Sequence, residues 1–256
     1  MFNKQENRLF EFLESKYREF HRIDFVANDP IQIPHQYKKK EDIEISAFIT
    51  SILAWGLRKT IINKASLLMD IMDHSPYDFV LHHTKKDLKK CMQFKHRTFN
   101  ADDLLYFIPS LQNIYLKHGG LEDAFFYQSN ASMMERISRF KQIFFELDHL
   151  KRTEKHLADP KKGSTAKRIN MYLRWMVRTN MGNVDFGIWR KFKPHELMLP
   201  LDVHTARVSR NLGLLKRSQN DWQAVMEVSK RLKQFDPLDP IKYDLALFGL
   251  GVTAEL

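Results

Sequence analysis

Apolar residues recur at intervals of three and four along most of this chain, which is the spacing of one face of an α-helix. Alternating apolar and polar residues, the pattern of a half-buried strand, are lacking apart from short ambiguous stretches. Only 9 of the 256 residues are glycine, and proline stands mostly at the ends of the periodic segments. The sequence therefore predicts an all-α fold. Helices are expected at about 3–20, 43–57 and 59–72 with a break at Gly56, 76–83, 85–91, 101–117 with Pro109 as a kink or break, 121–127 and 131–147.

The size and composition indicate a globular protein that forms one large domain or two small ones. Hydrophobic residues make up 43% of the chain and aromatic residues 12%, while every apolar run is shorter than the roughly 20 residues of a membrane span. The N-terminal stretch lacks the apolar core of a signal peptide. The single cysteine, Cys91, excludes an intrachain disulfide and any all-cysteine metal or iron–sulfur site. We expect a cytoplasmic, soluble protein with no cofactor, no metal, no membrane partner and no obligate protein partner.

Positive charge is concentrated in one segment. The chain has 41 Lys and Arg against 31 Asp and Glu, and residues 151–217 alone hold 16 of these cations against 5 acids. Such a local surplus is expected of a surface that binds the phosphates of a nucleic acid. An acidic protein partner or an anionic lipid surface would fit the same surplus.

Within that segment, a turn around Gly163 leads into a predicted helix that runs to about Arg178, with Ser164 or Thr165 as its N-cap. Ile169, Leu173 and Met176, with Tyr172, form the expected buried stripe. The neighbouring stripe carries Lys167, Met171, Arg174 and Arg178, spaced by four, three and four residues.

The stretch LPLDVHTARVSRNLGLL (199–215) predicts Asp202 as the N-cap of a helix over 203–211, with Gly213 ending it. A further amphipathic helix follows, with Asn220 or Asp221 as its cap. An apolar helix then begins with Asp239 as the cap and Pro240 in the first helical position.

These residue types suggest chemistry as well as structure. A turn whose amides open a helix can bind phosphate, and a lysine beside it can act as a cation or as a Schiff-base nucleophile. Asp202, 35 residues after Lys167, could act as a base or stabilise a developing cation. A plain N-cap and a solvated lysine account for the same residues without catalysis.

LPLDVHTARVSRNLGL resembles the V-D-T-H-x-x-R-V-x-x-R-L-G-L signature of the helix-hairpin-helix DNA glycosylases, the endonuclease III superfamily. Three further regions agree with the superfamily in the same order along the chain. Its early helices are similar to SAFITSILAWGLRKTIINKASLLM, and its hairpin with the helix that follows is similar to PKKGSTAKRINMYLRWMV. Its last core helix is similar to YDLALFGLG. The spacing is nearest to that of the archaeal 8-oxoguanine glycosylases. Over its whole length, through FKHRTFNADDLLYFIPSLQNIYLKHGGLEDAF and RINMYLRWMVR, the chain also resembles a bacterial family of unknown function.

The resemblance implies a catalytic role for two residues. Asp202 would stabilise positive charge on the sugar, and Lys167 would attack its C1′ atom as in the bifunctional members, with Lys161 or Lys162 as alternatives to Lys167. Trp55, Trp175 or Trp189 would stack on an everted base, although tryptophans of this kind are more often core residues. Residues suggested for nucleic-acid contact are Lys161, Lys162, Gly163, Ser164, Arg174, Arg178, His204, Arg207 and Arg210.

Two departures from the superfamily pattern are visible. The hairpin KKGST has one glycine where relatives have two, and Gly56 stands where relatives place a glutamine that fills the gap in DNA. The segment FKHRTF (94–99) mixes aromatic and basic residues, as a nucleic-acid contact or an ordinary basic loop would.

We therefore expect two helical subdomains, residues 41–165 and residues 1–40 with 166–256, with a cleft between them that Lys167 and Asp202 would face, as the resemblance to the superfamily implies. The leading hypothesis is a glycosylase, with or without lyase activity, that excises an oxidised purine from double-stranded DNA. The alternatives are a non-catalytic DNA- or RNA-binding protein of the same fold and a helical domain that binds a small molecule or a protein.

Overall fold

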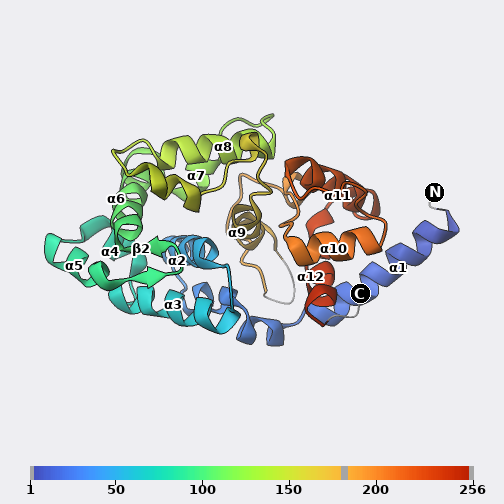
Figure 1. The fold of residues 1–256 in the computed structure, drawn as a ribbon, viewed down its shortest axis with the longest axis horizontal. Coiled ribbons are helices and arrows are strands. Elements are labelled where there is room, and N and C mark those ends of the chain that lie inside the picture. The colour runs from blue at the N-terminus through green and yellow to red at the C-terminus, as the bar shows by residue number, and fades with distance from the viewer. Residues whose placement is uncertain (1–2, 180–183, 254–256) are drawn as a thin grey trace. The chain divides into compact units, whose positions relative to one another are not determined.

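The computed structural model describes residues 3–179 and 184–253, and their regular structure is almost entirely helical, which confirms the predicted all-α class (Figure 1). The strands found within these residues are β1 (Lys95–His96) and β2 (Phe99–Asn100), which pair antiparallel with Lys95 opposite Asn100. None of the described helices combines the length and the apolar character needed to cross a bilayer.

The chain divides into two compact units. Unit 1 consists of Met1–Ala27 and Pro160–Leu256, and unit 2 of Asn28–Asp159. The sequence placed these boundaries at residues 41 and 166 instead. The segment that follows residue 28 belongs to unit 2 because two short 3₁₀ turns in it, η2 (Pro30–Gln32) and η3 (Pro34–Gln36), pack against the first long helix of that unit.

Unit 2 is built around α2 (Lys40–Leu53), which is buried on every face from Ile43 to Leu53. The Phe48 ring packs against Phe140 and Phe144, with centroids 5.7 and 5.5 Å away, and Phe107 completes this aromatic cluster. The other helices of the unit are α3 (Arg58–Ile71), α4 (Pro76–His82), α5 (Lys85–Lys90), α6 (Ala101–Lys117), α7 (Leu121–Phe125) and α8 (Met133–Phe144), with 3₁₀ turns η4 (Cys91–Gln93) and η5 (Lys151–His156).

Pro109 neither ends nor splits its helix. Helix α6 runs through it from Ala101 to Lys117, although proline removes one backbone hydrogen bond from a helix interior. The capping box of Asn100 and Asp103 fixes the start of α6. Buried contacts to α8 hold it further along: Ser110 Oγ and Tyr106 Oη both donate to the Phe144 carbonyl, at 2.6 and 2.7 Å.

Unit 1 centres on the apolar helix α12 (Tyr243–Thr253), which packs against α1 (Lys4–Phe20) and α10 (Val203–Asn211). The backbone of α12 comes so close to α1 that a Cβ atom on Gly249 would lie 2.3 Å from the Phe20 ring, so only glycine fits there. The remaining elements are α9 (Lys167–Val177), α11 (Trp222–Phe235) and the 3₁₀ turns η1 (Ile23–Asn28, which spans the boundary to unit 2), η6 (Pro160–Lys162), η7 (Pro194–Glu196) and η8 (Pro240–Lys242).

Replacing Phe48 by alanine is expected to lower the free energy of unfolding by about 3–5 kcal/mol, because the cavity would open among three packed rings. Equilibrium urea denaturation followed by circular dichroism measures the loss. The matched control is Leu116→Ala, at a residue of α6 that is 69% exposed, which should change stability by less than about 0.5 kcal/mol. Equal effects of the two substitutions would contradict this account of the core.

Candidate functional site

Asp202 caps helix α10, as the sequence predicted. Its Oδ1 atom accepts hydrogen bonds from the backbone N–H groups of His204 and Thr205, both at 2.9 Å. The helix then spans Val203–Asn211, the predicted range. One carboxylate oxygen thus satisfies two of the helix's first N–H groups, and the other oxygen, Oδ2, is left for another partner.

That partner is Lys167, the first residue of α9. Its Nζ atom lies 3.9 Å from Asp202 Oδ2, and the two side chains keep 24% and 26% of their surface exposed. The aliphatic part of the lysine passes along its own helix, where Nζ is also 3.7 Å from Met171 Sδ. An amine and a carboxylate are therefore brought together in a position that solvent and a ligand can reach.

The turn before α9 differs in detail from the prediction. The N-cap is Ala166, whose backbone is left-handed with φ 47° and which makes no side-chain cap, so neither Ser164 nor Thr165 caps the helix. Ser164 Oγ instead accepts from the Ala166 N–H at 3.2 Å. The turn is tied to α11 because the Gly163 carbonyl accepts from the Trp222 N–H at 3.1 Å.

The residues suggested for phosphate binding in this turn differ in how they are engaged. The Gly163 N–H donates to the Pro160 carbonyl at 2.9 Å, so it has no free hydrogen for a phosphate. The N–H groups of Ser164 and Thr165 have no acceptor within the described part of the chain. Lys161 and Lys162 are exposed on η6.

Arg174 and Arg178 lie in the interior of unit 1, which corrects their assignment as nucleic-acid contacts. Arg174 pairs with Asp244 at 2.5 Å and with Asp185 at 3.3 Å. Arg178 pairs with the same Asp185 at 2.9 Å. With 5% and 1% of their surface exposed, the two guanidinium groups neutralise buried carboxylates and are shielded from a DNA backbone.

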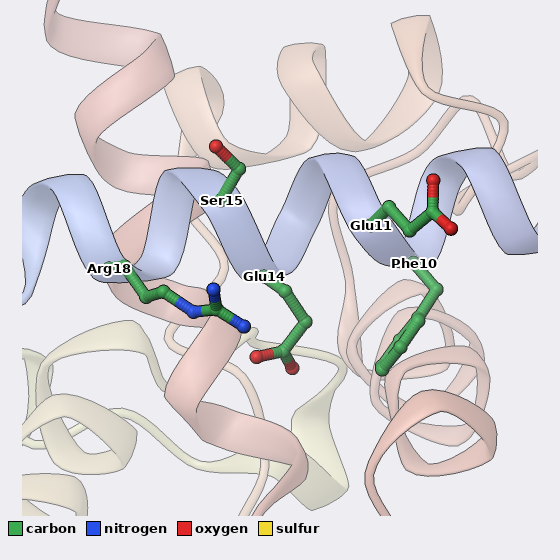
Figure 2. A pocket seen from close by; sticks show the side chains of 5 residues that line it. All are labelled: Phe10, Glu11, Glu14, Ser15 and Arg18. Atoms are coloured by element: carbon green, nitrogen blue, oxygen red, sulfur yellow. The ribbon is translucent and has the colours of Figure 1, made fainter.

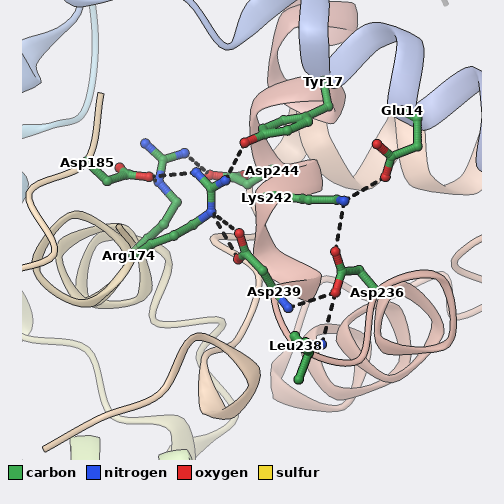
Figure 3. A network of polar contacts seen from close by, with 10 residues as sticks. Glu14, Tyr17, Arg174, Asp185, Asp236, Leu238, Asp239, Lys242 and Asp244 are labelled. Atoms are coloured by element: carbon green, nitrogen blue, oxygen red, sulfur yellow. Dashed lines mark hydrogen bonds and ion pairs between the residues drawn. The ribbon is translucent and has the colours of Figure 1, made fainter. Parts of the chain in front are cut away.

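The same ion cluster extends to α1 and to the segment before α12. Arg178 Nε donates to both oxygens of Asp239, and its Nη2 atom donates to Tyr17 Oη at 2.7 Å. Figure 3 shows these contacts beside a second group in which Lys242 joins Glu14 to Asp236, at 2.7 and 2.8 Å. The Asp239 carboxylate is thus committed to Arg178 and makes no side-chain cap for the turn that follows it, contrary to the predicted role.

Asp244 connects the ion cluster electrostatically to the candidate site. Burial raises the pKa of its carboxyl to about 6, against the opposing effects of the positive charges on Arg174 and Lys167 and with a further rise from Asp202. The charges of both site residues therefore reach this buried carboxyl. Sequence reasoning identified neither Asp244 nor Asp185 as a member of the site's surroundings. Asp244 could have been found, because an acidic residue in the otherwise apolar stretch YDLALFGLG indicates a buried charge that needs a partner.

Two of the three stacking candidates are core residues. Trp175 and Trp189 are fully buried, and Trp189 packs edge-on against Tyr172, with centroids 5.4 Å apart. They cannot receive a base, so these assignments were wrong. Trp55 is half-buried in unit 2 and carries the Arg97 guanidinium over its ring at 4.3 Å.

The basic residues of α10 differ in how far they are committed to the fold. His204 and Arg207 are exposed. Arg210 donates to the carbonyls of Arg217 and Ser218 and to the Asn220 side chain, so it closes the loop after its helix. Asp221, not Asn220, caps α11.

A shallow pocket of about 360 Å³ lies on helix α1 and is distinct from the Lys167–Asp202 pair. Figure 2 shows its lining, which comes from Phe10, Glu11, Glu14, Ser15 and Arg18. Glu14 is engaged by Lys242 and by Tyr243 Oη. In residues 3–179 and 184–253, no three His, Cys, Asp or Glu side chains come together in a group that could hold a metal ion.

The fold and site define an all-α protein with a buried ion cluster and a partly exposed lysine–aspartate pair in the same unit. The family model described as "Protein of unknown function (DUF2400)" matches residues 29–253, and the chain belongs to this family. No curated protein matches the chain, and no solved structure does.

Replacing Arg178 by methionine is expected to lower the free energy of unfolding by about 3–5 kcal/mol, because it removes the cation that pairs with Asp239 and one of the two cations that pair with buried Asp185. This loss of unfolding free energy should be smaller at pH 5 than at pH 8. Burial raises the pKa of Asp239, and the charge and hydrogen bonds of Arg178 oppose that rise. Without Arg178 the pKa of Asp239 should therefore rise further. The penalty of an Asp with a raised pKa is absent below its unfolded pKa of about 4 and grows as pH rises to the folded value.

Urea denaturation at the two pH values measures this difference. Arg207→Met, at an exposed position of α10, serves as the control and should change stability by less than about 0.5 kcal/mol at either pH. A pH-independent loss in the Arg178 variant would rule out the unpaired Asp239 carboxylate as its cause.

Substitutions of Asp202 should separate its capping role from its charge. Asp202→Ala is expected to cost about 1 kcal/mol of stability, whereas Asp202→Asn and Asp202→Ser should stay within a few tenths, because both side chains still accept from the helix N–H groups. Thermal and urea unfolding of the three variants test this. A large loss in Asp202→Asn would mean that the fold needs the negative charge itself.

Proposed function

We propose that the protein is a DNA-repair glycosylase with an associated lyase step, and that Lys167 and Asp202 carry the reaction. The observation that supports this most strongly is the 3.9 Å separation of the Lys167 amine and the Asp202 carboxylate, both partly exposed. The two residues are 35 positions apart in sequence and begin two different helices. An amine and a carboxylate at this distance can act on one sugar.

The chemistry follows from the two groups. Lys167 gives up a proton, for which Asp202 Oδ2 is the base within reach, and its nitrogen attacks C1′ of the nucleotide. The N-glycosidic bond breaks, its electron pair leaves with the base, and the base takes a proton. Asp202 stabilises the positive charge that develops on the sugar meanwhile.

The covalent product explains the lyase step. Ring opening converts the lysine–C1′ bond into an iminium ion, which makes the C2′ hydrogen acidic. Loss of that proton expels the 3′ phosphate by cleavage of the C3′–O bond. The iminium ion can be reduced to a stable secondary amine, so its formation can be measured.

Other features around the pair fit a phosphate-bearing substrate. The backbone N–H groups of Ser164 and Thr165 and the exposed Lys162 precede the helix that begins with Lys167, an arrangement that favours anions. Exposed His204 and Arg207 lie on the helix capped by Asp202. The choice of an oxidised purine in double-stranded DNA rests on the sequence resemblance, and eversion of the base from the duplex is required for access to C1′.

Borohydride trapping on duplex DNA with an abasic site tests the proposal. Wild-type protein should form a covalent adduct visible as a shifted band. Lys167→Met should form none, and Asp202→Asn should trap at least about tenfold more slowly, which corresponds to about 1.4 kcal/mol. Lys230→Met, at an exposed lysine of α11, is the control and should trap as wild type does. Equal trapping by Lys167→Met and wild type would contradict the assignment.

A non-catalytic DNA- or RNA-binding protein of the same fold is the second candidate. The engaged Gly163 N–H, which donates to Pro160 within the turn, and the single glycine of the hairpin favour it. This candidate predicts salt-sensitive binding of nucleic acid without an adduct and without release of a base from a panel of damaged duplexes. Such a result would replace the glycosylase proposal.

A further inference from the structure

A second pocket of unit 1 lies where the loop after α10 meets helix α11 (Figure 1). Its volume is about 340 Å³, and its lining includes residues of the loop and of α11, namely Gly213, Lys216, Glu227, Lys230, Arg231 and Gln234. The residues from α11 follow one another at intervals of three, one and three, so they share one face of that helix. None of them lines the pocket on α1.

Hydrogen bonds of the backbone hold the loop side of this pocket. Gly213 has φ 69° and follows the last turn of α10, where a left-handed residue commonly ends a helix. The chain then turns to α11, and the Lys216 N–H donates to Glu227 Oε1 at 2.6 Å. A Cβ atom on Gly213 would meet no other atom within 4 Å, so the space beside this glycine is open.

Arg231 orders the α11 side of the pocket. Its Nη2 atom donates to Glu6 Oε1 of α1 at 2.8 Å, and its Nη1 atom donates to Gln234 Oε1. Because the amide oxygen of Gln234 accepts from the arginine, the amide nitrogen is turned away from it. That nitrogen has no acceptor within residues 3–179 and 184–253, so it can donate to a ligand.

Two lysines of the pocket carry positive charge that the fold does not neutralise. Lys216 and Lys230 are exposed, and neither side chain forms an ion pair within the part of the chain that the structure describes. Together with Arg231 they give the lining three cations against the one carboxylate of Glu227. Lysine ammonium groups are point charges that commonly bind phosphate, so this balance favours a phosphate-bearing anion.

The nearby acids restrict which anion fits. Glu6 and Asp221 each pair with an arginine, at 2.8 and 2.5 Å, so their charges are balanced. Glu227 uses one oxygen for the N–H group of the loop, and its Oε2 atom has no hydrogen-bond partner among the described residues. That oxygen repels a second phosphate and can accept from a hydroxyl group. A ligand with a single phosphate and several hydroxyl groups meets both conditions, whereas a chain of phosphates does not.

We propose that this pocket, here called the Lys216–Lys230 pocket, binds a phosphorylated sugar or polyol of low molecular mass. Lys216, Lys230 and Arg231 hold the phosphate. The hydroxyl groups of the ligand donate to Glu227 Oε2 and accept from the amide nitrogen of Gln234. A volume of about 340 Å³ is within the usual range for small-molecule sites, about 300–1,000 Å³.

The Lys216–Lys230 pocket is separate from the lysine–aspartate pair. Asp202 caps the first turn of α10, whereas the pocket follows its last turn. The nine residues of this helix span about 14 Å at about 1.5 Å per residue. Binding in the pocket therefore requires no chemistry from Lys167 and Asp202.

Isothermal titration calorimetry with glucitol 6-phosphate tests the proposal. This probe has one phosphate and several hydroxyl groups but no aldehyde, so it cannot form a Schiff base with a lysine. Wild-type protein should bind it, and should bind inorganic phosphate at least about tenfold more weakly because the hydroxyl contacts are missing. Glucitol without a phosphate should not bind.

Substitutions in the lining should change this binding in different ways. Lys216→Met and Lys230→Met should each weaken the binding of glucitol 6-phosphate at least about tenfold, because each removes a cation from the phosphate. Glu227→Gln should tighten the binding of inorganic phosphate, since it removes a repelling charge. It should also reduce the preference for glucitol 6-phosphate over inorganic phosphate, because a neutral amide oxygen accepts from a hydroxyl group less strongly than a carboxylate does.

Lys59→Met is the matched control, because it removes an exposed lysine from helix α3 of unit 2, and it should bind the probe as wild type does. All these variants should keep the wild-type unfolding midpoint, since the lysines are exposed and Glu227→Gln retains an acceptor for the loop N–H. Lys167→Met should bind the probe like wild type, and Lys230→Met should still form the borohydride adduct. The two proposals can therefore fail separately.

Any of four results would overturn the proposal. These are absence of binding of glucitol 6-phosphate by wild-type protein at millimolar concentration, equal binding by Lys230→Met and Lys59→Met, and binding of glucitol as tight as that of its phosphate. The fourth is displacement of the probe by a single-stranded oligonucleotide at equal phosphate concentration, which would assign the pocket to nucleic acid.

Discussion

Two arginines one helical turn apart, one within α9 and the other at its C-cap, hold the charged interior of unit 1 together. Arg174 and Arg178 share Asp185 and reach Asp244 and Asp239 separately. Removing these charges from water is costly, and each remains buried only because opposite charges lie at hydrogen-bonding distance. Helix α9, the segment at Asp185 and the start of α12 are therefore fixed relative to one another by electrostatics as much as by apolar packing.

This constraint bears directly on the lysine–aspartate pair. Lys167 begins the helix that the arginines anchor, and Asp202 begins α10, which packs on the α12 helix that carries Asp244. The positions of both site residues therefore depend on the same ion cluster. Asp202 adds its own restraint, since one carboxylate oxygen is held by two backbone N–H groups while the other faces the amine. The Asp202 side chain can therefore cap its helix with one carboxylate oxygen and face the lysine amine with the other.

Local patterns in the sequence predicted the helices well and their surroundings poorly. Asp202 and the range Val203–Asn211 followed from a capping residue and a periodic stripe, both of which act within a few residues. Arg174 was wrongly assigned to a DNA-binding surface. Helical spacing shows which side chains share a face of the helix, but it does not show which other residues pack against that face. In the structure Arg174 pairs with Asp185 and Asp244, which are distant from it in the helical pattern. The left-handed Ala166 at the start of α9 had no local sequence signal, since Ser164 and Thr165 are the better caps.

The central claim is that the amine of Lys167 forms the covalent bond to the sugar. Tandem mass spectrometry of the wild-type protein, digested after borohydride reduction on an abasic duplex, locates that bond directly. The account predicts a reduced sugar remnant on the peptide that contains Lys167 and on no other lysine. A remnant on Lys161, on Lys162 or on the terminal amine, with Lys167 unmodified, would contradict it.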